Sequence, residues 1–334
     1  MCSRRHGGSS GVDPATADGA AALTTPQPAP DDLPTVVDGG FYGPASEAWR
    51  LNREAMLLLG AGPRALLLQI AHPLVAAGVA EHSDFRTDPW IRLSGTLRSY
   101  LRIVYGTAEA ARGEIRRLND LHRGIRGDVL EPAARDRHGR RYSALDPGLA
   151  LWVHATLVDS TIAAYDAWIE PLPREHRARY YEETLPVGRA FGIPASLLPP
   201  DLDAFEDYLA GMLAPGGEIE VGDVARDLAG SILRPPLGPA VAAAGWPVAR
   251  LAPMLDAIPS RAYAWLFWPS IGLLPPVIRE GYGLAWGLRQ RAVATWLVAT
   301  WQAWRPVLPP SFRHMPQAIR ADHRVGAGGR LLHA

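Results

Sequence analysis

Cysteine is nearly missing from this sequence, and lysine is missing entirely. The 334 residues include a single cysteine, Cys2, close to the start of the chain. One thiol excludes an intramolecular disulfide, a cysteine-based zinc cluster and the Cys-x-x-Cys-His motif that attaches c-type haem. These absences argue against a disulfide-stabilised secreted fold, and we expect a cytoplasmic protein.

The chain also lacks an excess of charge of either sign. It has 34 acidic and 34 basic residues, and all of the basic residues are arginine. A neutral chain lacks the general attraction that a basic surface has for nucleic acid or anionic membranes. We therefore expect no nucleic-acid partner.

Long hydrophobic runs are missing as well. No stretch reaches the roughly 18 apolar residues expected of a membrane-spanning helix, and the first 30 residues lack the continuous apolar segment of a signal peptide. The richest stretch, residues 55–79, is interrupted by Pro63, Arg64, Gln69, His72 and Pro73. We expect no transmembrane segment.

The composition divides the chain into a tail and a folded part. Residues 1–34 are rich in Ala, Gly, Ser, Thr, Pro and Asp, a composition that predicts disorder. Hydrophobic residues make up 48% of the whole chain, enough for a large core. We predict a single all-α domain over residues 35–325 and a flexible C-terminus over residues 326–334.

From Glu47 onward the apolar residues recur with helical spacing, and no alternating run is long enough to predict a sheet. Pro63 is expected at the first turn of a helix that ends at Ala71 and continues from Pro73 to His82 after a break. Asp146 and Pro147 form a capping sequence for a long helix that ends at Trp168. Residues 126–146 are predicted to form a loop or short hairpin. Further helices are expected over residues 45–60, 92–105, 108–124, 174–191, 202–213, 224–233, 241–255, 261–268 and 277–304.

One histidine lies on the apolar face of a predicted helix. Ile115, Leu118, His122 and Ile125 form one stripe, and the opposite face carries Arg116, Arg117, Asp120 and Arg123. The pattern predicts that His122 points toward the core. Two interpretations remain open: a core histidine bonded to a backbone carbonyl, or an axial ligand to iron.

Two further histidines stand in strongly apolar surroundings. His72 follows Leu67-Leu-Gln-Ile-Ala, and His154 lies in Leu151-Trp-Val-His-Ala-Thr-Leu-Val. Either histidine alone is most simply structural, but three on apolar helices favour an internal site lined by polar groups. No short metal signature such as His-Glu-x-x-His is present, and no Walker loop or nucleophile elbow.

Arg92 and Thr96 are four residues apart and face one direction on their predicted helix. They are interpreted either as a solvated arginine with a threonine bonded to its own backbone, or as the polar end of a pocket. In the second interpretation, Arg92 supplies positive charge where an anionic group or reduced oxygen needs it.

Tryptophan is concentrated in the last third of the chain. Indoles bury large areas, so we interpret these residues mainly as core and cover of a helical bundle. Tryptophans near arginines also occur at bilayer interfaces, which leaves peripheral membrane contact open. The residues are Trp265, Trp268, Trp286, Trp296, Trp301 and Trp304.

Several sequence blocks, taken in order, resemble the family of latex clearing protein and the MpaB-type oxygenases. The resemblance extends from about Arg53 to Tyr208, and its first block contains the sequence Ala-His72-Pro. The blocks are residues 53–85, 88–97, 104–107, 121–127, 142–144 and 151–157.

The resemblance implies a globin-like helical core with additional C-terminal helices and a non-covalently bound haem b. His122 matches the proximal axial histidine of the family, and Arg92 and Thr96 match its distal pair. His154 matches a further histidine that supports the haem region. His72 belongs to the Ala-His-Pro block and has no assigned role.

The sequence departs from the rubber-cleaving members directly before the distal threonine. Those members have a lysine that can approach the iron, whereas this chain has Gly95. The missing amine counts against rubber cleavage. The acidic residue proposed as a base in those enzymes has no secure counterpart, with Glu81 as the candidate.

The function implied is that of a haem b-dependent oxygenase. It would act on dioxygen and a small apolar substrate, such as an isoprenoid or lipid, with a redox partner that the sequence does not specify. The alternative is a non-catalytic helical protein that binds haem or an apolar ligand. A third alternative is a family member that has lost haem, with its histidines as hydrogen-bonding core residues.

Overall fold

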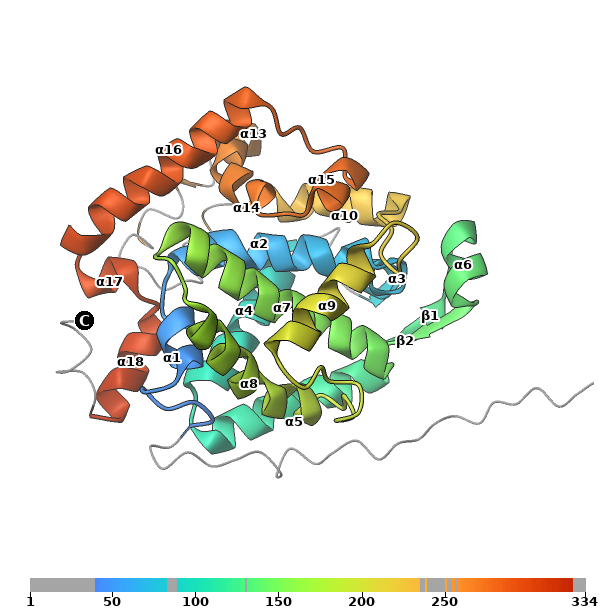
Figure 1. The fold of residues 1–334 in the computed structure, drawn as a ribbon, viewed down its shortest axis with the longest axis horizontal. Coiled ribbons are helices and arrows are strands. Elements are labelled where there is room, and N and C mark those ends of the chain that lie inside the picture. Colours follow the sequence, from blue (N-terminus) through green and yellow to red (C-terminus); the bar gives the residue numbers. More distant parts are fainter. Residues whose placement is uncertain are drawn as a thin grey trace, which may run out of the picture.

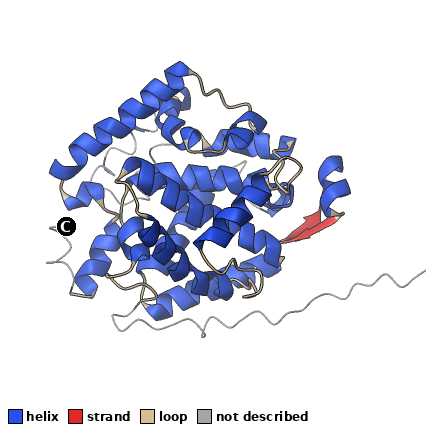
Figure 2. Ribbon diagram, viewed as in Figure 1, coloured by secondary structure: helices blue, strands red, loops and turns tan. Residues whose placement is uncertain are grey.

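The computed structural model describes residues 40–82, 89–129, 131–234 and 258–326, together with the single positions 238, 250, 254 and 255. Within these residues the regular structure is almost entirely helical (Figures 1 and 2), so the all-α prediction is confirmed. The exception is an antiparallel hairpin of β1 (Arg126–Asp128) and β2 (Arg141–Ser143). The predicted tail, the predicted helix over 241–255 and residues 327–334 lie outside the described residues.

Two apolar helices, α2 (Met56–Ala71) and α7 (Pro147–Trp168), make the most extensive contact between elements (Figure 1). Helix α7 begins as predicted, because the Asp146 carboxylate accepts the N–H groups of Gly148 and Leu149 and Pro147 occupies the first turn. Trp152 Nε1 donates to the Leu68 carbonyl at 3.1 Å and joins the two helices.

The remaining helices surround this pair (Figure 1). On one side lie α10, α14, α15 and α16, and α5 and α8 lie on the other. Their bounds are α1 (Glu47–Asn52), α3 (Pro73–His82), α4 (Pro89–Tyr105), α5 (Ala108–Arg123), α6 (Pro132–His138), α8 (Arg174–Ala190), α9 (Leu202–Leu213), α10 (Asp223–Ile232), α13 (Ser260–Tyr263), η3 (Ala264–Phe267), α14 (Trp268–Gly272), α15 (Pro276–Gly281), α16 (Leu288–Trp304), η4 (Arg305–Val307), α17 (Pro310–Arg313) and α18 (Pro316–Arg324).

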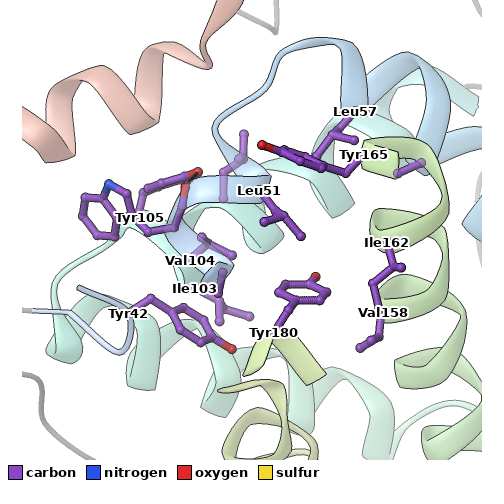
Figure 3. Packing of buried hydrophobic residues seen from close by; sticks show 14 of the residues in the cluster. Tyr42, Leu51, Leu57, Ile103, Val104, Tyr105, Val158, Ile162, Tyr165 and Tyr180 are labelled. Atoms are coloured by element: carbon purple, nitrogen blue, oxygen red, sulfur yellow. Dashed lines mark hydrogen bonds between the residues drawn. The ribbon is translucent and has the colours of Figure 1, made fainter. Parts of the chain in front are cut away.

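The largest buried hydrophobic cluster joins α1, α4, α7 and α8. Figure 3 shows the Tyr180 ring of α8 between Ile103 of α4 and Val158 of α7. A second cluster packs α2 against α10 and α15. These clusters fix the positions of the helices, while the globin-like arrangement stays a prediction.

The break between the first two helices is not where the sequence predicts it. Helix α2 continues through Pro63, so the predicted helix start at that residue is wrong. The chain breaks at residues 53–55 instead, where its backbone pairs with a distant segment. Ala55 N donates to Arg313 O, and Met315 N donates to Arg53 O, each at 2.7 Å. Backbone groups used by this long-range pairing cannot continue a helical ladder.

Other boundaries agree with the sequence or deviate locally. Helices α5, α8 and α9 and the hairpin match the prediction, but α6 inside the hairpin was not predicted. The predicted helix over 277–304 is wrong as one element, because the chain turns at Gly283 with a φ of +63° between α15 and α16. A positive φ suits glycine and interrupts a helix.

The C-terminal tryptophans cover the bundle and do not form its core. Trp265, Trp296 and Trp304 are 36%, 59% and 62% exposed. The fully buried tryptophans are instead Trp49, Trp152 and Trp168. Of the predicted roles as core and cover, these three tryptophans have that of cover.

Helices α2 and α3 meet at a bend of 104°. His72 ends α2, and Pro73 begins α3, where a missing N–H costs little. No single helix in the described part of the chain has the length and hydropathy needed to cross a membrane, and only this bent pair has them jointly.

Substitution of Gly60 tests how closely α2 and α7 must pack. A Cβ at this position would come within 2.6 Å of the Trp168 ring, whereas a Cβ at Gly62, on the same helix, would meet nothing within 4 Å. We expect Gly60→Ala to lower the free energy of unfolding by about 1–3 kcal/mol through overpacking. Gly62→Ala should raise it by about 0.5–1 kcal/mol, because alanine favours helix. Urea unfolding of both variants measures the difference, and equal stability would contradict the packing described here.

Candidate functional site: a histidine-lined cavity

A cavity of about 340 Å³ lies among α2, α3, α4, α5, α7 and α8. Its lining is predominantly Leu, Ile and Val, with a few polar side chains that include Thr96, His122 and His154. This volume falls within the range of about 300–1,000 Å³ typical of small-molecule sites, which have the same mixture of lining groups. The cavity is therefore the candidate binding site.

His122 reaches this cavity from the last turn of α5. The predicted stripe is confirmed: Ile115 is fully buried, and Leu118, His122 and Ile125 line the cavity. The opposite face is exposed at all four predicted positions, which are Arg116, Arg117, Asp120 and Arg123. The lining also includes Leu121 and Leu145, which are 45% and 43% exposed. The cavity thus reaches the protein surface on the side of His122.

His154 lies deeper, on α7. Residues 150, 153, 154, 157 and 158 line the cavity at the spacing of one helical face. Burial lowers the pKa of His154 to about 4, so its ring is neutral near pH 7. Its Nε2 is inaccessible to solvent and has no hydrogen-bond partner among the described residues. Such an atom costs about 1–3 kcal/mol when it stays unsatisfied, and it lies beside Gly188 of α8, where an added Cβ would come within 3.4 Å of it.

The distal pair predicted from the sequence lies on α4. Thr96 lines the cavity, so the structure brings Thr96, His122 and His154 around one space. Arg92 stands one turn earlier on the same helix, and its side chain lies outside the described part of the chain. A Cβ at Gly95 would meet nothing within 4 Å, so this position has room for a larger side chain.

Glu81 stands beside the cavity and is held by a tyrosine. The Tyr142 hydroxyl, which lines the cavity, donates to Glu81 Oε2 at 2.5 Å. Burial, together with this hydrogen bond, raises the pKa of Tyr142. Gly127 permits the contact, because a Cβ there would meet both side chains. The sequence alone could not show that the contact between Tyr142 and Glu81 requires a glycine at position 127.

His82 is a lining residue that the sequence analysis missed. It ends α3, and its Nε2 lies 3.2 Å from the Arg126 carbonyl oxygen in β1. Its position ten residues after His72 is close to three helical turns, but the bend at Pro73 removes any simple relation between the two faces. The spacing of His72 and His82 in the sequence therefore could not predict that His82 lines the cavity.

The structure separates His72 from the other predicted histidines. His72 does not line the cavity, and it is 5% exposed at the corner between α2 and α3. Its Nδ1 accepts the Leu74 N–H at 3.2 Å and so caps α3. Its ring centroid lies 5.1 Å from that of His138. Burial, with a smaller contribution from His138, lowers the pKa of His72 to about 4.

These observations define a helical protein with an internal, mainly apolar pocket that three histidines line from different helices. Comparison with known protein families agrees with this class. The ER-bound oxygenase mpaB/B'/rubber oxygenase catalytic domain matches residues 49–304, most of the chain, and the chain belongs to this family. The family identifies an oxygenase, an enzyme that acts on dioxygen and an organic substrate, and it suggests a metal or haem cofactor in general.

Two relatives from mycobacteria are similar to this chain. The chain is 27% identical over 241 residues to "Uncharacterized protein Rv2237" of Mycobacterium tuberculosis and to "Uncharacterized protein Mb2261" of Mycobacterium bovis. In each case the match covers 70% of this chain and 83% of the relative. No solved structure matches the chain significantly.

The buried imidazole of His154 makes stability depend on pH. Its pKa of about 4 in the folded protein lies below the ordinary 6.5, so its contribution is complete above pH 6.5 and is lost as the pH falls toward 4. This loss is worth about 3 kcal/mol. We expect cofactor-free His154→Leu to lose correspondingly less stability between pH 6.5 and 4 in urea unfolding.

His323→Leu is the matched control, because His323 is exposed on α18. Its acid-induced loss of stability should equal that of the wild type. An unchanged loss in His154→Leu would contradict burial of a neutral imidazole at this position.

Proposed function

We propose that this protein is a haem b-dependent oxygenase that acts on a small apolar substrate, with haem held non-covalently in the cavity described above. The observation that carries the proposal is a largely apolar cavity that His122 and His154 line from two different helices. Membership of an oxygenase family supports the same conclusion.

The residues present fit haem in both chemistry and charge. Haem b needs an imidazole ligand for iron and an apolar space for the macrocycle, and when bound it would supply the iron that activates dioxygen. We assign the axial ligand to His122. This residue stands in the last turn of α5, where the negative end of the helix dipole favours a nearby cation.

The other polar lining groups would orient what enters the cavity. The Thr96 hydroxyl can donate a hydrogen bond to a polar ligand atom at the cavity surface. We keep Arg92, one turn away on α4, as the proposed source of positive charge for stabilising developing negative charge. His154 contributes a wall of the cavity next to these groups.

The lining favours an apolar substrate. Leu, Ile and Val predominate around the cavity, and the exposed Leu121 and Leu145 continue this apolar surface outward. An isoprenoid or lipid chain would displace water from such a surface, which lowers the free energy of the complex. Gly95 stands where rubber-cleaving members have a lysine, so we propose a substrate smaller than a polymer.

We also propose a cytoplasmic location, on the sequence argument given above. One alternative is a non-catalytic helical protein that binds haem or an apolar ligand. It is favoured by the state of Glu81, which is hydrogen-bonded to Tyr142 and does not line the cavity, so no free carboxylate base is evident there among the described residues.

The axial assignment predicts a spectroscopic result. The purified protein should carry a Soret band, and His122→Ala should lose it or bind haem about tenfold or more weakly, because the iron loses its protein ligand. Absorption titration with haem measures the affinity. The His323→Ala control should keep the wild-type spectrum, because His323 is exposed on another helix.

Oxygen uptake by the haem-loaded protein with a panel of alkenes and lipids then distinguishes enzyme from binder. Substrate-dependent uptake supports the oxygenase. A Soret band without uptake across the panel favours the binder, and a wild type that cannot take up haem rejects both.

A further inference from the structure

A second cluster of metal-ligating side chains lies outside the cavity. His72 comes from the corner between α2 and α3, His138 from the end of α6, and Glu218 from the connection between α9 and α10. One ligand atom from each residue lies within 4.8 Å of the other two. In Figure 1, α6 extends beyond the main bundle. The cluster therefore joins the peripheral helix α6 to the end of the central helix α2.

The geometry of His138 differs from that of a simple core histidine. Its side chain is 6% exposed, and its Nδ1 lies 3.0 Å from Glu218 Oε2. Its Nε2 is buried and has no hydrogen-bond partner in the described part of the chain. This Nε2 is the ring nitrogen available to a metal ion. The His72 ring lies at 5.1 Å between centroids, tilted by 39°.

We propose that His72, His138 and Glu218 bind a divalent transition metal of the zinc type. Two imidazoles and one carboxylate are a ligand set that zinc uses, with a fourth position left for water. The buried imidazoles supply neutral ligands, and the half-exposed Glu218 supplies negative charge and a side chain free to close on the ion. The metal would fasten the α6 hairpin to the corner between α2 and α3.

The surrounding contacts hold the three ligands close together. Arg137, next to His138, donates to the Gly217 carbonyl at 2.9 Å, next to Glu218. At the other end of α6, the Glu131 carboxylate accepts the Asp223 N–H at 2.7 Å. These bonds align α6 with residues 217–223, so little chain ordering is left for the metal to impose.

Metal binding competes with two existing interactions. An ion held by both His138 Nε2 and Glu218 requires the carboxylate to leave His138 Nδ1. His72 Nδ1 accepts the Leu74 N–H, so an ion on Nε2 requires the proton to move to Nδ1 and this cap to open. The bond is long, at 3.2 Å, and a helix cap is weak compared with a bound metal ion. We therefore expect 1:1 binding that is weaker than in a preformed structural zinc site.

This site is separate from the proposed haem. Leu74 lines the cavity, whereas His72, His138 and Glu218 do not. Zinc binding at the cluster therefore does not rest on the proposed oxygenase function, and either proposal can fail without the other.

Calorimetric titration of the tag-free, full-length chain with Zn²⁺ tests the site. Cys2→Ser should be present in every variant, because it removes the chain's one thiol as a competing ligand. The wild-type background should bind one Zn²⁺ and gain several degrees in Tm. Co²⁺ in place of zinc should give the visible absorption of a low-symmetry site. His138→Ala should weaken binding by about tenfold or more.

Glu218→Gln keeps the test valid if His138→Ala does not fold, because Glu218 is half-exposed and glutamine retains its shape. It should weaken zinc binding while the haem spectrum and the fold stay unchanged. His323→Ala is the control and should bind as the background does. The proposal is overturned if no zinc binds, or if both His138→Ala and Glu218→Gln bind it with unchanged affinity.

Discussion

The packing of α2 against α7 is the constraint on which the rest of the structure depends. Both helices are apolar on nearly every side, so each must be enclosed by other elements. One buried charge fixes their relative position: the Arg64 guanidinium contacts Asp159 at 2.6 Å and Ser160 Oγ at 2.8 Å. A buried arginine without these partners would be costly, so the pair resists sliding. This register directs His154 toward the cavity.

One wall of the cavity lies in the centre of the bundle, on α7, and another lies near the surface, on α5. His154 projects from α7, at the centre of the bundle, whereas His122 projects from the C-terminal turn of α5 beside exposed lining residues. An imidazole fixed deep in the core and another near the opening suit a ligand that enters from the surface and is held along its length. The family membership gives the oxygenase class, and the cavity gives the place where a small molecule can bind.

Local patterns predicted much of this fold, and long-range contacts account for the errors. Helical periodicity placed α5 and its inward histidine, and the Asp146–Pro147 capping sequence placed the start of α7. The break at residues 53–55 could not be predicted, because it depends on pairing with residues 313–315. Likewise, apolar neighbours correctly predicted that His72 is buried. They could not predict which side of a 104° bend its ring would face.

The pairing of residues 53–55 with 313–315 also has a consequence for biosynthesis. Glu54 contacts Arg305 at 2.8 Å, and Arg53 contacts Asp322 at 2.5 Å, so charges buried near the beginning of the fold find their partners near its end. During synthesis on the ribosome, Arg53 and Glu54 cannot form these ion pairs until almost the entire chain has emerged. Vectorial folding from the N-terminus therefore cannot complete this part of the core until residues 305–322 have been synthesised.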